Sequence, residues 1–164
     1  MAPVPDRYLL LLGSNIEREE NLDRAVQMLE SRFVVLARSR ICESDAVGDP
    51  TGPAFYNRAL VVRADLAPRE MHSHLHAIEH CLGRLRTMDR HSPRTIDIDI
   101  LCALDAAGAL LPDPPLHKDV RRHHYAAVPA AEIAGDLVLP EGTTLAAAAA
   151  ALGPVPKGFR VLPA

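Results

Sequence analysis

The chain has 164 residues, of which 48% are hydrophobic and 24% are charged, and its formal net charge is -3. This length and composition predict one globular domain over residues 1–164 and exclude an intrinsically disordered protein. The slightly acidic balance argues against a protein that grips nucleic acid through phosphate contacts. The first residues lack the order of a signal peptide, and no apolar run approaches the roughly 20 residues that span a bilayer. We therefore expect a cytoplasmic monomer without a membrane or nucleic-acid partner.

Apolar periodicity predicts alternating strands and helices along the first part of the chain. A run at 8–12 ends at the turn formers of 13–15 (GSN), which is typical of a short buried strand. Residues 21–30 repeat apolar side chains at helical spacing. The segments that follow are a strand at 33–41, a loop rich in Gly and Pro at 43–53 and a strand at 55–64.

A second helix and a fourth strand complete the pattern. Pro68 suits a first helical turn, and Gly83 stands where a glycine ends a helix. Residues 95–101 alternate strictly between polar and apolar, as a strand does. The resulting βαββαβ order predicts a ferredoxin-like α+β fold, an antiparallel sheet with helices packed on one face. Two short helices, at 128–133 and 143–152, form a helical C-terminal extension.

The strand at 95–101 carries two carboxylates on one face. Its isoleucines belong to the core, whereas Asp97 and Asp99 lie together on the other face, about 7 Å apart at Cα. Their repulsion disfavours the fold unless something compensates it, and oxygen ligands favour Mg²⁺ with substrate phosphates. A solvated strand face is the other interpretation of the pair.

A basic segment precedes this strand directly. Residues 83–94 contain four arginines and one aspartate. Arginine binds phosphate oxygens in a bidentate manner, and together with Mg²⁺ it stabilises the charge on a transferring phosphoryl group. Alone the segment would be read as a solvated loop, but beside the Asp pair it indicates a nucleotide polyphosphate.

These segments belong to an ordered set of motifs. Residues 94–101 (RTIDIDIL) follow Glu79 and 83–86 (GRLR), while 12–15 (LGSN) and 55–57 (FYN) precede them. The set resembles the 6-hydroxymethyl-7,8-dihydropterin pyrophosphokinases of folate biosynthesis in order and spacing. The resemblance implies a ferredoxin-like fold, ATP as co-substrate, two Mg²⁺ ions, and transfer of diphosphate to the pterin's hydroxymethyl group with release of AMP.

The resemblance also implies roles around ATP. Asp97 and Asp99 match the metal aspartates, and Arg84 and Arg94 match the arginines that act on the phosphates in catalysis. For His117, a surface imidazole is the alternative reading. The residues implied as ATP-binding are His76, Glu79, Arg86, Arg90, Ile100 and His117.

The pterin site begins with two residues on one strand face. A flat ring could stack on Phe55, and the Asn57 amide offers a donor and an acceptor to the heterocycle edge. The resemblance adds Tyr125 as the second ring, and the backbone near Ser44 and Val47. Phe55 as an ordinary core residue remains the alternative, because aromatic residues on strands usually pack inward.

Four positions depart from the family's usual residues. His91 stands where tryptophan is found, Ser92 replaces a glycine, Asp45 follows Ser44 where Thr-Pro is frequent, and His123 replaces an arginine. Because they lie in loops, we expect them to change affinity and rate more than reaction type. They leave open a relative that acts on a different pterin.

Two further alternatives come from other features of the sequence. His72, His76 and His80 recur at i, i+4 and could form a metal stripe, although the polar face of an amphipathic helix is usually just solvated. A non-catalytic ferredoxin-like module that binds a ligand or a partner is also open, since a fold alone does not determine function.

Overall fold

The structure, a computed structural model, describes residues 3–46, 51–83 and 96–164. Its elements in chain order are β1 (Arg7–Ser14), α1 (Arg18–Glu30), β2 (Val34–Arg38), β3 (Cys42–Ser44), β4 (Phe55–Arg63), α2 (Pro68–Cys81), β5 (Asp97–Leu104), the 3-10 helix η1 (Lys118–Arg121), α3 (His124–Ala134), α4 (Leu145–Ala150) and β6 (Arg160–Val161).

Within these described residues, six strands form one antiparallel sheet. The order of its main path is β5-β1-β4-β3-β6, and β2 pairs with β4 beside β3. β4 is long enough to hold both, since β3 pairs with its first residues and β2 with its last ones. β1 and β4 therefore lie in the centre, where β1 is buried from Tyr8 to Ser14 and β4 from Ala59 to Val62.

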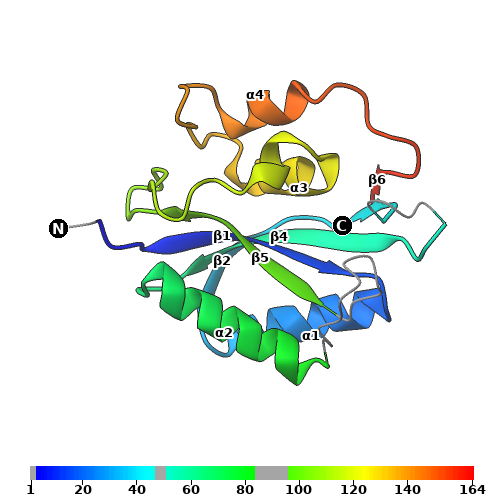
Figure 1. Ribbon diagram of the computed structural model, residues 1–164, viewed down its shortest axis with the longest axis horizontal. Helices are drawn as coiled ribbons and strands as arrows, with labels where there is room; N and C mark the ends of the chain where they lie inside the picture. The colour runs from blue at the N-terminus through cyan, green and yellow to red at the C-terminus, as the bar shows by residue number, and fades with distance from the viewer. Residues whose placement is uncertain (1–2, 47–50, 84–95) are drawn as a thin grey trace.

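The helices α1 and α2 cover one face of this sheet (Figure 1). Leu22, Leu29, Leu75 and Ile78 on these helices are buried against sheet residues such as Leu10. Apolar positions at helical spacing give each helix one such face, which is why the sequence predicts both helices. Gly83 ends the second one as expected, because its φ of 84° lies in the left-handed region.

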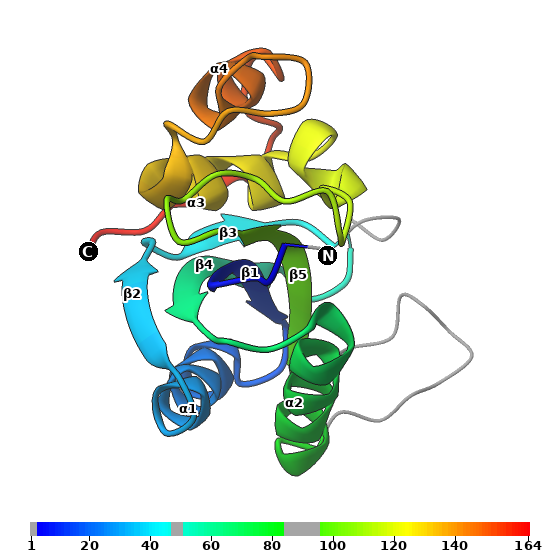
Figure 2. The same cartoon turned by 90° about the vertical axis from the view of Figure 1, so that its left-hand side faces the viewer.

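α3 covers the opposite face and α4 packs on the outer side of α3, so helices lie on both sides of the sheet (Figures 1 and 2). Leu9, Leu11 and Val61 pack there with Ala126 and Ala130 of α3. The expectation of helices on one face thus holds for the βαββαβ part only. The extension forms a layer of its own, since Leu9, Leu11, Ala59 and Val61 of β1 and β4 give the sheet a second apolar face.

The predicted strand at 33–41 is wrong in its extent, because only β2 (Val34–Arg38) lies within it, and β3 (Cys42–Ser44) begins after its predicted end. Ser39 lies at the break, where its Oγ accepts a hydrogen bond from the Ala59 backbone N–H (2.9 Å). Arg58 Nε donates to the Ser39 carbonyl oxygen (2.8 Å). Side-chain hydrogen bonds of this kind replace part of the backbone ladder, which lets the chain turn between the two strands.

Other element boundaries also differ from the sequence prediction. β1 continues through Gly13 and Ser14, which pair with Asn57 and Tyr56 instead of ending the strand. Ser44 belongs to β3 and not to the loop after it. The remaining differences are an earlier start of α1 and α3, a shorter α4, an extension of β5 to Leu104, and the unpredicted η1 and β6. In the part of the chain that the structure describes, every helix is too short or too polar to cross a bilayer.

Candidate active site

Strand register brings the aspartates of β5 close to the predicted pterin residues of β4. Gly13 of β1 pairs with Asp97 on one side and with Asn57 on the other. One strand therefore separates the two sets, although Asn57 and Asp97 are far apart in the sequence. Leu11, which pairs with Asp99, is buried in the core under α3, so this row of residues faces the α3 layer.

A bulge in β5 maintains this orientation. The pairing with β1 shifts between Leu9 and Leu10, so Leu101 has no direct partner on β1. Leu101 and Cys102 consequently both pack on the α3 side. Without the extra residue, the alternation would place either the aspartates or the end of the strand on the wrong face.

Gly13 leaves room between the two sets. A Cβ atom at this position would lie 2.7 Å from Asn57 Oδ1 and 3.7 Å from Cδ1 of the Phe55 ring. Contacts of 2.7 Å are not tolerated, so a side chain here would displace the Asn57 amide. The LGSN motif marks this glycine in the sequence, but only the register explains why it must lack a side chain.

Asp97 and Asp99 both have intermediate exposure on one strand face, and Ile96 and Ile98 are buried on the other, as predicted. Burial, then the charge of Asp97, raises the pKa of Asp99 to about 6, with contributions from Glu79 and Asp119. His117 acts in the opposite direction. A divalent cation would relieve this accumulation of negative charge.

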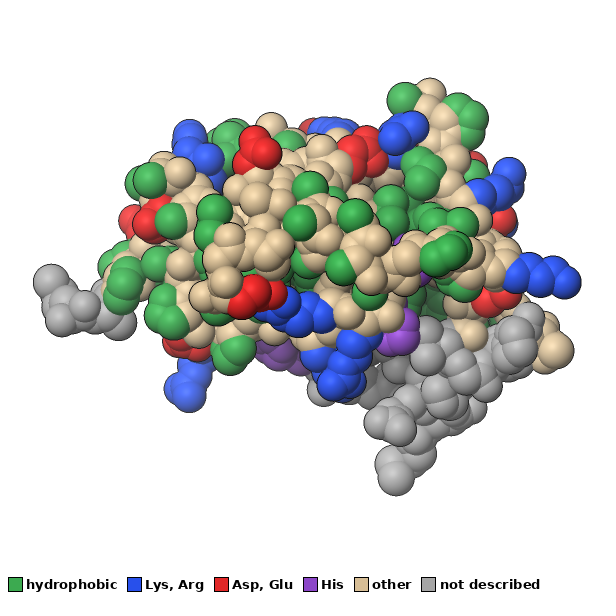
Figure 3. Space-filling view, turned by 90° about the horizontal axis from the view of Figure 1, so that it is seen from above, with side chains coloured by type: hydrophobic (Ala, Val, Ile, Leu, Met, Phe, Trp, Pro, Cys, Tyr) green, Lys and Arg blue, Asp and Glu red, His purple; other side chains and the backbone are tan. Residues whose placement is uncertain are grey.

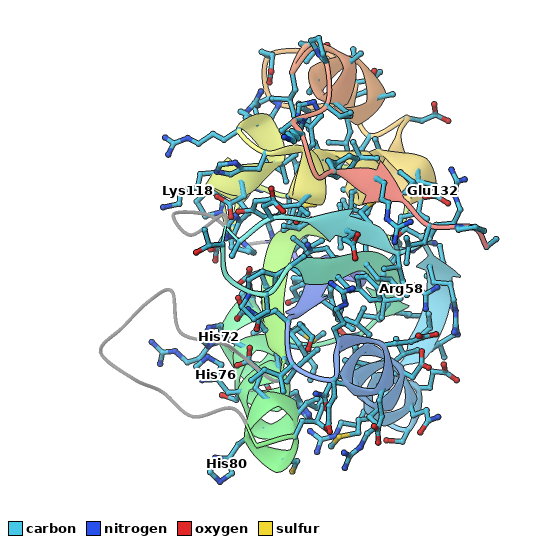
Figure 4. The ribbon with its side chains drawn as sticks, turned by 90° about the vertical axis from the view of Figure 1, so that its right-hand side faces the viewer. Arg58, His72, His76, His80, Lys118 and Glu132 are labelled. Carbon is cyan, nitrogen blue, oxygen red and sulfur yellow. The ribbon has the colours of Figure 1, made fainter. Side chains whose placement is uncertain are left out.

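The pair fits magnesium better than a closed metal cage. Among the residues that the structure describes, no three His, Cys, Asp or Glu side chains form a metal-binding group. Mg²⁺ needs only one or two carboxylates when phosphates and water complete its shell. His72, His76 and His80, which project from the same side of α2 (Figure 4), form no such group among the described residues.

The predicted pterin residues of β3 and β4 contact each other. Asn57 Nδ2 donates a hydrogen bond to Ser44 Oγ (3.3 Å), and both residues are buried. Phe55 pairs with Ser44 across the strands and keeps intermediate exposure at the end of β4. Its place at the end of the strand therefore leaves the ring available to a ligand.

η1 and the start of α3 bring His117, Asp119 and Tyr125 over this face. The His117 N–H donates to the Leu101 carbonyl oxygen of β5 (2.8 Å). His117 Nδ1 accepts from the Asp119 N–H (3.1 Å), and the Tyr125 hydroxyl donates to Asp119 Oδ2 (2.8 Å). Burial raises the pKa of Tyr125, and so do the hydrogen bond to Asp119 and the charges of Asp119, Asp99 and Asp97. Asp119 has no counterpart among the residues selected from the sequence.

The residues predicted for the adenosine side lie on α2 and β5. Glu79 is 3% exposed, and its Oε2 accepts a hydrogen bond from the Ile98 N–H (2.8 Å). Ile100 packs against the core under α1 and α2, so only its backbone faces the strand edge. The His76 ring lies 4.1 Å from the His72 ring, centroid to centroid. The predicted residues that lie outside the described part of the chain are Val47, Arg84, Arg86, Arg90 and Arg94, with His91 and Ser92.

The chain is similar in sequence to a known protein family. The model of the family described as 7,8-dihydro-6-hydroxymethylpterin-pyrophosphokinase matches residues 9–135. A 2-amino-4-hydroxy-6-hydroxymethyldihydropteridine pyrophosphokinase of Methylorubrum extorquens is 38% identical over 154 residues, which are 90% of this chain and 94% of the relative. The protein of the same name from Pseudomonas aeruginosa is 33% identical over 148 residues, covering 85% and 87%.

Solved structures share the fold at low sequence identity. A Plasmodium falciparum HPPK-DHPS A437G structure with SDX-DHP has a TM-score of 0.71 and 12% identity, and covers 96% of this chain. The A437G structure with pteroate has a TM-score of 0.66 at 12% identity and covers 90%. This chain spans less than half of those two chains, 49% and 43%. From the family match and the similarity of its relatives, the chain belongs to the 7,8-dihydro-6-hydroxymethylpterin-pyrophosphokinase family.

Proposed function

We propose that the α3-facing side of β5, β1 and β4 performs the diphosphate transfer of this family. The chain is a pyrophosphokinase of folate biosynthesis, a transferase with ATP as co-substrate. The observation that supports the proposal most directly is that Asp97, Gly13 and Asn57 lie side by side on three neighbouring strands. It supports a geometry in which the phosphates and the pterin lie side by side, one strand apart, so that the reacting groups are held close together.

Asp97 and Asp99 would hold two Mg²⁺ ions together with the phosphates of ATP. The raised pKa of Asp99, at about 6, supports this assignment, because a cation favours the ionised carboxylate. When bound, the ions would neutralise charge on the phosphate oxygens.

Phe55 and Tyr125 would stack on the two faces of the pterin. The rings come from β4 and α3, and α3 packs on β4. Asn57 would bond to the heterocycle edge, with Ser44 supporting its amide at 3.3 Å, and the backbone near Val47 would meet the remaining edge.

Arginines and a histidine would surround the phosphates. We assign the catalytic role to Arg84 and Arg94, whose guanidinium groups would stabilise charge on the transferring group. His117 would donate from Nε2, since its Nδ1 already accepts a hydrogen bond. The residues that we assign to the rest of ATP are Arg86 and Arg90 for the phosphates, and His76, Glu79 and the backbone of Ile100 for the adenosine.

The chemistry then needs positioning more than covalent help. The hydroxymethyl oxygen of the pterin forms a bond to the β-phosphorus while the bond from that phosphorus to the AMP oxygen breaks. The hydroxyl proton leaves to solvent, and the products are AMP and the pyrophosphorylated pterin. Holding the hydroxyl and the leaving oxygen in line supplies most of the acceleration.

Product analysis tests this proposal. The purified protein is incubated with ATP, Mg²⁺ and 6-hydroxymethyl-7,8-dihydropterin, and nucleotides and pterins are separated by chromatography. We expect AMP to appear in step with pyrophosphorylated pterin, and no product when EDTA replaces Mg²⁺. ADP as the nucleotide product would overturn diphosphate transfer, and unchanged turnover in EDTA would overturn the metal assignment.

The remaining sequence expectations stay part of the proposal. We propose one domain over residues 1–164, active as a monomer in the cytoplasm on small-molecule substrates alone. On the side of the molecule that carries α4, acidic and basic side chains are interspersed with apolar ones (Figure 3). The mixture of charges on this face supports the proposal that nucleic acid is not a partner, because phosphate binding needs a surface of concentrated positive charge. Light scattering during size-exclusion chromatography would test the oligomeric state.

A further inference from the structure

We propose that Asp119 is a positioning residue of the pterin site, whose carboxylate holds the Tyr125 ring in the plane that stacks on the substrate. The inference rests on the proposed function, because it takes Tyr125 as a pterin-stacking ring. Asp119 lies in η1, and Tyr125 follows in the first turn of α3.

Two contacts restrain the Tyr125 ring. Its hydroxyl donates to Asp119 Oδ2 at 2.8 Å, which holds the far end of the side chain. The His123 ring is stacked on it, with 4.9 Å between centroids and 15° between planes. A ring held at its tip and on one face presents its other face in a single orientation. Ordering the ring before the pterin arrives reduces the entropy lost on binding.

The same residue connects the ring to the phosphate side of the site. The Asp119 N–H donates to His117 Nδ1 (3.1 Å), and the His117 N–H donates to Leu101 O of β5 (2.8 Å). The turn formed by η1 is thereby attached to the strand that carries the Asp pair. A shift of Asp119 would move Tyr125 relative to that strand.

Charge alone does not account for an acid at this position. The Asp119 carboxylate adds to the negative field around Asp99, which opposes ionisation of the metal aspartate. A neutral residue would relieve that field. The hydrogen bond that the Asp119 carboxylate accepts from Tyr125 is a favourable interaction that offsets this unfavourable charge. An asparagine at this position would keep a hydrogen-bond acceptor without the charge.

Four variants separate hydrogen bonding from charge. Asp119→Ala removes the acceptor, Asp119→Asn keeps it, Tyr125→Phe removes the donor, and Asp119→Ala combined with Tyr125→Phe removes both. Pterin affinity is measured by calorimetry in the presence of Mg²⁺ and a non-hydrolysable ATP analogue. The affinity for the analogue itself is measured without pterin.

We expect Asp119→Ala and Tyr125→Phe each to weaken pterin binding about 3- to 10-fold, which is the range for one hydrogen bond. The double variant should be no weaker than the worse single variant, because both remove the same interaction. Asp119→Asn should stay within about 2-fold of the wild type. Unchanged pterin affinity in Asp119→Ala, or fully additive losses in the double variant, would overturn the inference.

A second measurement tests the positioning without any substrate. The chain contains three tyrosines, so a protein with ¹³C-labelled tyrosine gives a small, assignable set of ring signals by NMR. We expect faster flipping of the Tyr125 ring in Asp119→Ala than in the wild type or Asp119→Asn. An unchanged flip rate in Asp119→Ala would overturn the positioning role alone. Failure of the wild type to bind pterin would overturn the proposed function, and the role of Asp119 in pterin binding with it.

Discussion

Asp99 is a carboxylate whose ionisation the surrounding fold opposes. Burial and the charge of Asp97 raise its pKa from 3.8 to about 6. A raised pKa in the folded state means that this group favours folding below its unfolded pKa and that the contribution is lost as pH rises through about 6. In the metal-free protein, the ionised form of Asp99 therefore lowers the stability of the fold, and the proposed metal binding is the reason for a carboxylate here.

This leads to a prediction about pH-dependent stability. We compare the free energy of unfolding of Asp99→Asn with that of the wild type at two pH values. The difference should shift in favour of the variant by on the order of 2 kcal/mol from pH 4.5 to pH 7.5, because the wild-type carboxyl must ionise over this range. Urea denaturation in EDTA at the two pH values measures the gain. Asp65→Asn, at an exposed aspartate, is the matched control. A stability difference that does not change with pH would contradict the assigned pKa.

The same pair gives a prediction about activity. Asp97→Ala and Asp99→Ala should each abolish turnover, with a loss of at least about 100-fold, because either change removes a metal ligand. The fold should remain as stable or become slightly more stable, since like-charge repulsion is relieved. AMP release and a thermal unfolding curve check both statements, and Asp65→Ala serves as the control. Near-normal turnover in either variant would show that the carboxylates do not hold the metal.

At the scale of the elements, β1 determines how the metal and pterin sides meet. Gly13→Ala would place a Cβ atom 2.7 Å from Asn57 Oδ1, and the amide is a terminal group that can rotate away. We expect a folded protein whose pterin affinity falls by roughly 10-fold, the value of one or two hydrogen bonds. Affinity for the ATP analogue should change little. An equal loss for both ligands would indicate a general distortion of β1 instead.

A buried carboxylate adds a hydrogen bond to the apolar packing between α2 and β5. Glu79→Ala removes the acceptor of the Ile98 N–H, so a buried donor is left without this partner. We expect a loss of about 2–3 kcal/mol in the free energy of unfolding, measured with urea. Glu79→Gln retains an acceptor oxygen and should lose less. If Glu79→Ala and Glu79→Gln lower the free energy of unfolding equally, loss of the hydrogen bond to β5 is not the cause of the destabilisation.

At the scale of the whole molecule, the C-terminal segment completes the sheet beside the pterin residues. β6 pairs with β3, and the Leu162 N–H donates to the Ile41 carbonyl oxygen (2.8 Å). Glu43 of β3 bridges Arg160 of β6 (2.9 Å) and Arg18 of α1 (2.7 Å). β3, which carries Ser44, is therefore held on both sides.

Removal of residues 154–164 should consequently affect binding more than folding. The pairing lost is short, so we expect a fall of a few degrees in Tm. Pterin affinity should fall several-fold because β3 becomes an edge strand, while affinity for the ATP analogue is retained. Calorimetry with both ligands measures this. Unchanged pterin affinity would show that β4 alone holds Ser44 in place.

Local patterns account for the parts of the fold that sequence predicts well. The stripe of α2, its Pro68 and Gly83 ends, and the alternation that separates Ile98 from Asp99 all depend on residues within a few positions of each other. Where prediction fails, a distant partner intervenes. β1 continues through Gly13 and Ser14 because it pairs with β4 there, and β2 ends before the predicted strand does because the Ser39 side chain bonds to Ala59.

The sequence by itself determined the succession of the long helices and strands, the placing of two carboxylates on one strand face, and the set of motifs that marks the family. Only the tertiary structure decided that Gly13 lies between Asp97 and Asn57, that the C-terminal helices form a second covering layer, and that Asp119 holds Tyr125. The reason is physical. Periodicity is set by the local geometry of the backbone, whereas register and layer packing depend on contacts between residues that are far apart in the chain.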